Sequence, residues 1–329
     1  MIILRAVIFI SLCLCATVSA AADYVLTQPT DSVIGELQMV KAQADDTLLD
    51  IARRHGLGYQ DITLANPGVD IWLPQAGTDV HLPTRFVLPH VPREGLILNI
   101  PERRLYYFPA TSDEAATVVT HPLGIGRQGW GTPFVKTRIT GKRKHPVWYP
   151  PASIREEAAA NGEPLPERVG PGPDNPLGDF AMRLGLPSYL IHGTNRPWGV
   201  GMRVSHGCIR LYPEDIESLY QQIQVGTAVR IVNQPYKIGV LNSVIYLEAH
   251  PRLQENEQHR DKLTAVVDRV IDRLPKAGYT VNWDTVRGVV DQADGIPVAI
   301  GTIKADRVVE SIPQPRATGI SQSRVFHQE

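Results

Sequence analysis

The two stretches that decide how this chain folds are IHGT at residues 191–194 and SHGCIRL at residues 205–211. A short apolar run at 189–191 leads into the first stretch and predicts a strand. Pro213 follows the second stretch and opens a helical pattern, at a position where the missing N–H of proline is not needed. We therefore expect Cys208 on a turn or short strand just ahead of a helix.

Cys208 has the sequence surroundings expected of a nucleophile. It is the only cysteine beyond residue 15. A thiol reacts as the thiolate, and positive charge nearby, here from Arg203, His206 and Arg210, is expected to lower its pKa. His192 is the candidate base, because the preceding strand can bring its imidazole alongside the sulfur.

The residues around the cysteine suit a turn that a substrate can approach. Gly193 and Gly207 leave room for close contact with the backbone, and N–H groups around Gly207 can point at a developing oxyanion. A lone cysteine has two other interpretations, a small buried hydrophobe or a zinc ligand. Zinc would need three or four ligands, so one Cys and two His would have to recruit more.

Taken together, the two stretches resemble the signature of the L,D-transpeptidase catalytic domain, also called the YkuD type. That family has a His-Gly, a gap and then Ser/Thr-His-Gly-Cys, and here His192 and Cys208 fill these positions. The resemblance implies a β-rich sandwich with the cysteine at a cleft, spanning residues 95–233. It also implies candidate roles: Gly207, His206 and Ser205 for the turn and oxyanion, and Arg210, Arg203, Gly193, Thr194 and Trp148 for substrate binding.

The reaction implied by the resemblance is a two-step acyl transfer on peptidoglycan. His192 takes the proton of Cys208, and the thiolate attacks the carbonyl of diaminopimelate in a tetrapeptide stem, which releases D-Ala. An amine, from another stem or from the terminal Lys of an outer-membrane lipoprotein, then attacks the thioester. The alternatives are an L,D-carboxypeptidase, which uses water as the acceptor, and a non-catalytic wall-binding protein. The family implies neither a metal nor a cofactor.

Residues 1–22 predict a secretory signal peptide. A positive charge precedes an almost entirely apolar stretch at 6–18, and small residues at 19–22 offer a cleavage site. A membrane anchor is the weaker alternative because the stretch is short, and a lipoprotein anchored through Cys13 or Cys15 would lack the usual small residue before the cysteine. The mature chain would keep one thiol, which in an exported protein suggests reactivity. The expected location is the periplasm.

Residues 37–84 resemble a LysM module, a peptidoglycan-binding unit of strand, two helices and strand. Thr47 with Asp50 three residues on predicts a capped helix, and Asn-Pro-Gly at 66–68 ends a second helix. The resemblance implies binding to N-acetylglucosamine sugars, although Asp45 stands where the family usually has Gly. A plain α+β module without sugar affinity is the alternative.

The remaining chain predicts a lead-in, the strands of the catalytic domain, a lid and a C-terminal unit. Residues 23–36 predict an irregular lead-in. Within the catalytic domain, the sequence predicts a hairpin at 96–108 and strands at 116–121, 135–140 and 227–232. A helix at 152–160 precedes a Pro- and Gly-rich segment at 161–178, where the family places a lid. Residues 234–306 predict a small α+β appendage with a hairpin at 236–250 and helices at 255–274 and 281–293, and residues 307–329 a loose tail.

Composition narrows the function further. With 33 Lys and Arg against 34 Asp and Glu, the net charge is −1, which argues against a nucleic-acid partner because such a partner needs a clustered basic face. The basic run at 142–146 is interpreted as a solvated face, and Trp148 and Tyr149 beyond it either line the groove or pack the lid. The sequence thus predicts an α+β multidomain protein, a YkuD-type catalytic sandwich between a βααβ LysM module and an α+β appendage.

Overall fold

The computed structural model describes residues 22–28, 30–110, 117–253, 261–274 and 278–304. Residues 1–21 of the predicted signal peptide and the predicted tail at 307–329 lie outside these residues. So do residues 255–260, where a predicted helix was expected to begin. Among the described residues, no helix is both long enough and apolar enough to cross a membrane.

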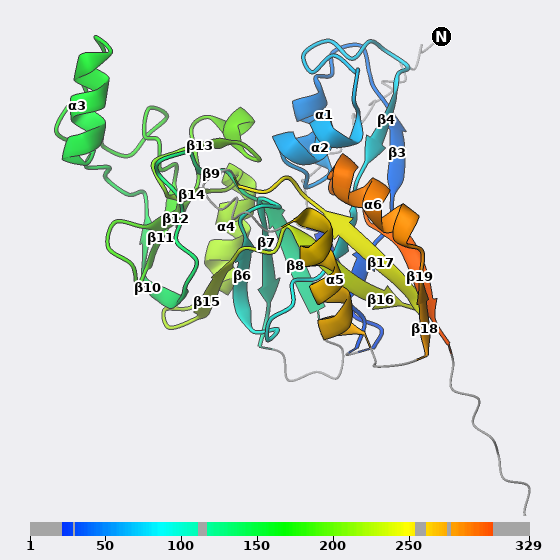
Figure 1. Cartoon of the computed structure of the whole chain (residues 1–329). Helices are drawn as coiled ribbons and strands as arrows, with labels where there is room; N and C mark the ends of the chain where they lie inside the picture. The colour runs from blue at the N-terminus through cyan, green and yellow to red at the C-terminus, as the bar shows by residue number, and fades with distance from the viewer. Residues whose placement is uncertain (1–21, 29, 111–116, 254–260, 275–277, 305–329) are drawn as a thin grey trace, which may run out of the picture.

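A nine-stranded mixed sheet forms the centre of the molecule (Figure 1). From one edge to the other its strands are β1 (Ala22–Val25), β8 (Thr117–Pro122), β7 (Arg104–Phe108), β6 (Gly95–Asn99), β15 (Ala228–Val232), β10 (Lys136–Lys144), β11 (Phe180–Leu184), β12 (Leu190–His192) and β14 (Ile209–Arg210). β6 and β7 form the predicted hairpin, with Arg103 left-handed at its turn (φ 59°). Most neighbours are antiparallel, but β6 pairs with β15, and β12 with β14, in parallel.

Both faces of the sheet are buried at its central strands β6 and β7. Because side chains alternate along a strand, Leu96 and Leu98 of β6 point into one core and Ile97 into the other. The first core includes residues of α4 (Pro213–Gln222). The second includes helices of the N-terminal module. That module and the catalytic sheet therefore share one core, although the sequence predicts them as separate domains.

The N-terminal module has the predicted order of elements: β3 (Gln38–Lys41), α1 (Leu48–Arg54), α2 (Tyr59–Ala65) and β4 (Asp79–Leu82). α1 begins with the predicted capping box, in which Asp50 N donates to Thr47 Oγ1 and Thr47 N to Asp50 Oδ2, both at 3.1 Å. We expected the lead-in at 23–36 to be irregular, but it contains two strands. β1 pairs with β8, and β2 (Val33–Gly35) pairs with β5 (Arg85–Val87), so the partners of these short strands lie far along the chain.

The C-terminal unit is a four-stranded sheet on which two helices pack (Figure 1). Its strands are β16 (Tyr236–Leu241), β17 (Val244–Ala249), β19 (Val298–Ile303) and β18 (Tyr279–Val281), and its helices are α5 (Lys262–Arg273) and α6 (Trp283–Gln292). The hairpin and both helices were predicted. β18 and β19 were not, and the start of the expected second helix is instead the end of β18.

The strand predicted at 135–140 continues as β10 to Lys144 and so takes up part of the basic run. Lys142 is not merely solvated. Its Nζ donates to the carbonyl of Ile223 at 2.6 Å and to that of Tyr220, at the end of α4, where unpaired carbonyls and the helix dipole attract a cation. The predicted helix α3 (Ala152–Ala160) has no buried residue and stands away from the sheets (Figure 1).

A buried ionic cluster joins the three parts of the chain. Lys237 of β16 places its Nζ 2.7 Å from Glu102 Oε2, 2.8 Å from Glu248 Oε1 and 2.6 Å from the carbonyl of Val87. His250 Nε2 lies 2.6 Å from the same Glu248 oxygen. All four charged or titratable side chains are buried. The ammonium supplies the positive charge between two carboxylates that would otherwise be unpaired in the interior.

Replacing that ammonium tests how strongly the cluster holds the three parts together. Lys237→Met should lower the free energy of unfolding by about 3–5 kcal/mol, because it leaves two buried carboxylates without their cation. Lys41→Met is the matched control, since Lys41 pairs with Asp79 at 2.7 Å but on the surface, where such pairs contribute about 0–1 kcal/mol. Urea denaturation measures both, and equal losses in the two variants would contradict the interpretation.

Candidate active site

The register of two short parallel strands places the candidate nucleophile and base on one face. Ile191 of β12 pairs with Ile209 of β14, and His192 pairs with Arg210. The two isoleucines are fully buried in the first core. Since successive side chains alternate, His192 and Arg210 project from the opposite face, and so does Cys208, which precedes Ile209. The sequence prediction that strand and turn bring the imidazole and sulfur to one side is therefore consistent with this register.

The sulfur of Cys208 lies between two backbone groups at the start of β12. Its Sγ is 3.5 Å from the carbonyl oxygen of Ser188, and the N–H of Leu190 hydrogen bonds to it. Burial raises the pKa of the Cys208 thiol, and this effect outweighs the lowering by the Leu190 N–H and by the charge of Arg210. The expected lowering by a nearby cation is thus present for Arg210, but the net change in the pKa is upward because desolvation is the larger effect.

His192 is buried, with 3% of its surface exposed. This burial, together with the charge of Arg210, lowers its pKa to about 3. Its Nδ1 is 2.6 Å from the carbonyl oxygen of Gly193. A carbonyl oxygen only accepts, so Nδ1 of the neutral ring carries the hydrogen and the lone pair is on Nε2. The ring is thus in the form that a general base requires.

The turn before Cys208 is held by hydroxyl groups. Ser205 Oγ donates to the Cys208 carbonyl at 2.6 Å and accepts from Gly207 N at 3.2 Å, while Thr132 Oγ1 donates to the Gly207 carbonyl at 2.9 Å. Gly207 has φ +104°, and an added Cβ would lie 2.9 Å from the Tyr189 ring, so glycine is required here. The Gly207 N–H, expected to face an oxyanion, is engaged by Ser205.

His206 faces away from this pair. Its Nε2 lies 3.0 Å from Glu157 Oε2 of α3 and 3.0 Å from Arg127 Nη2, and its ring meets Trp130 edge-on with centroids 4.9 Å apart. Arg127 and Glu157 form an ion pair. The hydrogen bond from Arg127, and to a smaller extent the one from His206, lowers the pKa of Glu157 to about 2. The sequence did not indicate Glu157 or Arg127, because their partners lie far along the chain.

The predicted substrate-binding residues divide into two groups. Arg210 lies beside His192, and Thr194 Oγ1 accepts from the N–H of Arg196 at 2.9 Å. Arg196 is close enough to lower the pKa of Arg210, and the charge of Arg210 in turn acts to lower the pKa of Cys208. The sequence missed Arg196, for which no motif gave a signal. Gly193 lies on the same strand end, with Ile216 of α4 against it.

Two predicted residues lie elsewhere. Trp148 forms a backbone bridge with Val169 inside the lid segment, and no described contact joins its side chain to Cys208. Arg203 belongs to β13 (Arg203–Ser205), which pairs with β9 (Ile125–Gly126). Its Nε donates to the Gly126 carbonyl at 3.2 Å, so it is directed to the other side of the catalytic turn.

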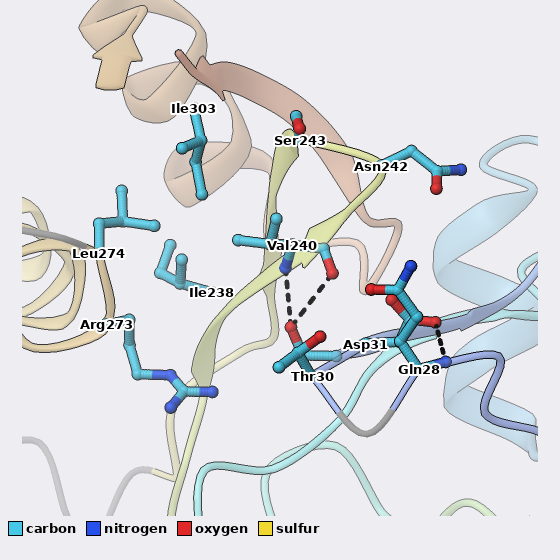
Figure 2. A pocket seen from close by; sticks show the side chains of 11 residues that line it. Gln28, Thr30, Asp31, Ile238, Val240, Asn242, Ser243, Arg273, Leu274 and Ile303 are labelled. Carbon is cyan, nitrogen blue, oxygen red and sulfur yellow. Dashed lines mark hydrogen bonds between the residues drawn. The ribbon is translucent and has the colours of Figure 1, made fainter. Parts of the chain in front are cut away.

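A cavity of about 440 Å³ opens between the N-terminal lead-in and the C-terminal unit (Figure 2). Asp31 of the lead-in, Val240 and Asn242 of the β16–β17 hairpin and Arg273 of α5 are among the residues that line it. Cys208 and His192 are not. The candidate active site is therefore defined by the β12–β14 pair and not by this cavity.

A neutral imidazole and a partly exposed sulfur on one sheet face are the base and the nucleophile that a cysteine-dependent acyltransferase needs. The chain belongs to the L,D-transpeptidase family, whose members are peptidoglycan transpeptidases. The family model for the YkuD L,D-transpeptidase catalytic domain matches residues 93–231, and Cys208 and His192 both fall within that range.

Curated relatives carry the name of this family. The chain is 38% identical over 289 residues to the probable L,D-transpeptidase ErfK/SrfK of Salmonella typhimurium, covering 86% of this chain and 92% of the relative. It is 38% identical over 247 residues to the probable L,D-transpeptidase YbiS of Escherichia coli, covering 74% and 79%. The catalytic domain of Enterococcus faecium L,D-transpeptidase aligns at 17% identity and a TM-score of 0.32 over 44% of this chain and all of that one.

The depressed pKa of His192 predicts a specific pH dependence of stability. An unfolded histidine binds a proton near pH 6.5, whereas folded His192 does so only near pH 3. As the pH falls from about 6.5 to about 4, protonation therefore favours the unfolded chain, by roughly 3 kcal/mol at the lower pH.

The measurement is urea denaturation of the wild type and of His192→Asn across this range. The variant should lose less stability on acidification than the wild type, since the other groups cancel in the difference. His145→Asn is the matched control, because His145 is an exposed histidine beside Asp179. A His192→Asn profile parallel to that of the wild type would contradict a buried neutral imidazole.

Proposed function

We propose that this protein is a periplasmic L,D-transpeptidase that acts on peptidoglycan stem peptides through a thioester on Cys208. The observation that carries the proposal is the parallel register of β12 and β14, which puts His192 and Cys208 on one face. Membership of the L,D-transpeptidase family supports the reaction class. The role of each residue is our inference from the geometry.

In the first step, His192 Nε2 accepts the thiol proton as the Cys208 sulfur attacks the carbonyl of the stem diaminopimelate. Because burial favours the neutral form of both groups, the proton moves with the attack and not before it. The tetrahedral oxyanion forms near the turn, where the Cys208 N–H and, on release from Ser205, the Gly207 N–H are the donors. The imidazolium then protonates the departing D-Ala nitrogen.

In the second step, an amine attacks the thioester and His192 accepts its proton. The C–S bond then breaks, and the imidazolium returns the proton to the Cys208 sulfur. Arg210, whose charge acts on the sulfur, is the cation that can hold a carboxylate of the stem there, and Arg196 lies close to Arg210. A stem diaminopimelate would give a direct cross-link, and the terminal Lys of an outer-membrane lipoprotein would attach that protein to the wall. With water as the acceptor, the same site would be an L,D-carboxypeptidase.

The N-terminal module would hold the glycan as a LysM unit. Trp72 and Leu73 are each 64% exposed in the loop after α2, and their N–H groups donate to Asp70 Oδ1 at 2.8 and 2.9 Å. This fixed, exposed aromatic platform suits stacking on a sugar ring. The module is tied to the catalytic part, for example by Tyr59 N donating to the Val200 carbonyl at 3.0 Å.

The proposed location rests on the predicted signal peptide at residues 1–22 and on the relatives. Those relatives are proteins of Salmonella typhimurium and Escherichia coli, which are Gram-negative bacteria with a periplasm. Expression of the full chain with a periplasmic reporter fusion would test the export.

The function itself is tested by trapping the acyl-enzyme with a carbapenem and by digesting sacculi. Intact-protein mass spectrometry should show one adduct on the wild type and none on Cys208→Ser. His192→Gln should slow adduct formation about 100-fold or more, the usual size of a general-base effect. Ser218→Ala, a change on α4, is the control and should react like the wild type.

Muropeptide analysis then separates the remaining alternatives. Loss of tetrapeptides with new cross-links supports transpeptidation, and loss with tripeptides alone supports the carboxypeptidase. A folded wild-type protein that forms no adduct and leaves the tetrapeptides intact would contradict catalysis and favour the wall-binding alternative.

A further inference from the structure

Four exposed cations project from the outer face of the neighbouring strands β10 and β11. These strands lie side by side (Figure 1), and Ile139 of β10 pairs with Leu184 of β11 in the first core. Because side chains alternate along a strand, the adjacent Arg138 and Arg183 point away from that core. The full set, which we call the cation stripe, is Lys136, Arg138, Arg143 and Arg183.

The stripe lies on the same face of the sheet as the catalytic pair. Ala181 of β11 pairs with His192 of β12 on one side and with Arg143 of β10 on the other. Residues that are directly opposite each other lie on one face, so these three form a row. Neighbouring strands are about 4.8 Å apart, which puts the Cα atoms of Arg143 and His192 roughly 10 Å apart. His192 and Ala181 are buried and Arg143 is exposed, so the row leads from the enclosed site to the surface.

The described part of the chain does not neutralise this charge. None of the four cations forms an ion pair with a described residue. Two carboxylates near the stripe already have partners. Glu94 pairs with Arg230 of β15, and Asp179 Oδ1 lies 3.2 Å from His145 Nδ1. Lys136 stands directly opposite Arg230, and like charges in that position destabilise a sheet. The chain has a net charge of −1, so the stripe is a local excess of positive charge that packing does not explain.

An anionic polymer fits this arrangement better than a small anion. From Lys136 to Arg143 the stripe extends roughly 20 Å, at about 3.3 Å per residue. A single phosphate or carboxylate would meet one or two of these cations, whereas a chain of carboxylates would meet all of them. The stem peptides of peptidoglycan provide such a series, because D-Glu, diaminopimelate and the terminal D-Ala each carry a free carboxylate.

We infer that the cation stripe binds the anionic stem peptides that neighbour the stem reacting at Cys208. The identity of the anion rests on the proposed function, while the preference for an anionic polymer rests on the stripe alone. The contacts would concentrate stems at the catalytic face without choosing the bond that reacts. They would also weaken with salt, because exposed charges are screened beyond about 10 Å at 0.1 M ionic strength.

The test measures binding of the full chain to purified sacculi by co-sedimentation, with Cys208→Ser in every variant to prevent turnover. Removing the three arginines of the stripe together, Arg138→Gln, Arg143→Gln and Arg183→Gln, should raise the Kd about 10-fold at about 20 mM salt. At about 500 mM salt the variant and the unmutated stripe should bind alike, because screening leaves little attraction to lose.

The matched control removes the same charge from another surface. Lys262→Gln, Arg287→Gln and Lys304→Gln together replace three exposed cations of the C-terminal unit. The Kd of this control variant should stay within about 2-fold of the unmutated value. Equal losses in the two triple variants would mean that only the overall charge matters and would overturn the inference.

Other ligands test whether stem carboxylates are what the stripe binds. Sacculi whose carboxylates have been amidated should bind the unmutated stripe about 10-fold more weakly at low salt, and the triple arginine variant should lose little more. Chitin, a neutral polymer of N-acetylglucosamine, should bind both proteins equally. Vesicles of phosphatidylglycerol and phosphatidylcholine should bind more weakly than sacculi. Tighter binding to the vesicles would overturn the assignment to stem peptides.

Two further measurements separate this inference from misfolding and from the proposed function. Thermal unfolding identifies a variant that fails to fold. In that case Arg143→Gln with Arg183→Gln replaces the triple variant, with an expected rise in Kd of about 5-fold. The binding assay uses Cys208→Ser protein, so its result does not depend on catalysis. Failure of wild-type protein to form the carbapenem adduct rejects the proposed function, whereas a Kd for sacculi that neither salt nor the arginine variant changes rejects the stripe.

Discussion

The chemistry of this protein depends on one short parallel pairing, β12 with β14. Both strands bury an isoleucine on the core side, and the bridge from Gly124 to Arg210 fixes the far edge of β14 with backbone bonds of 2.8 and 2.9 Å. A slip of one residue would turn every side chain to the other face. His192 would enter the apolar core and an isoleucine would face the substrate. The hydrophobic core thereby sets the geometry of the reacting groups.

The rest of the chain makes the surroundings of that pair rigid. The N-terminal module shares a core with the catalytic sheet, and Arg53 of α1 pairs with Glu214 of α4 at 2.7 Å. The buried cluster around Lys237 adds the C-terminal unit to the same body. By contrast, α3 buries no side chain and is joined to the catalytic turn through Glu157. Segments with so few buried contacts open at the lowest free energy, so α3 is expected to separate from the catalytic turn more easily than the packed elements do.

Local signals in the sequence predicted the parts of the fold that depend on neighbouring residues. The capping box of Thr47 and Asp50, the β6–β7 hairpin and the helix after Pro213 are all set within a few positions. The motif also identified Cys208 and His192 as candidates. The short strands β1, β2, β18 and β19 escaped prediction or were misplaced, because their partners lie far along the chain and three to six residues give no clear period.

The same limit applies to the site. Nothing in the local sequence distinguishes Arg203, which turns to a cavity shared with Arg103 and Arg252, from Arg210, which stays beside His192. Nor could spacing tell that His206 would face Glu157 and Trp130. The sign of the Cys208 pKa change was missed for a related reason: sequence neighbours reveal charge, but burial comes from the whole fold, and burial dominates here.

The neutral state of the pair has a consequence for the oxidation of the thiol. Oxidation of cysteine follows its thiolate character and its exposure, so a nucleophile kept as thiolate would be vulnerable in an oxidising compartment. Burial keeps Cys208 protonated and His192 unprotonated until a substrate is present. The negative charge that the reaction then develops is met by Arg210, whose charge already acts on the sulfur. This cation therefore suits a charge that arises during the reaction better than a thiolate at rest.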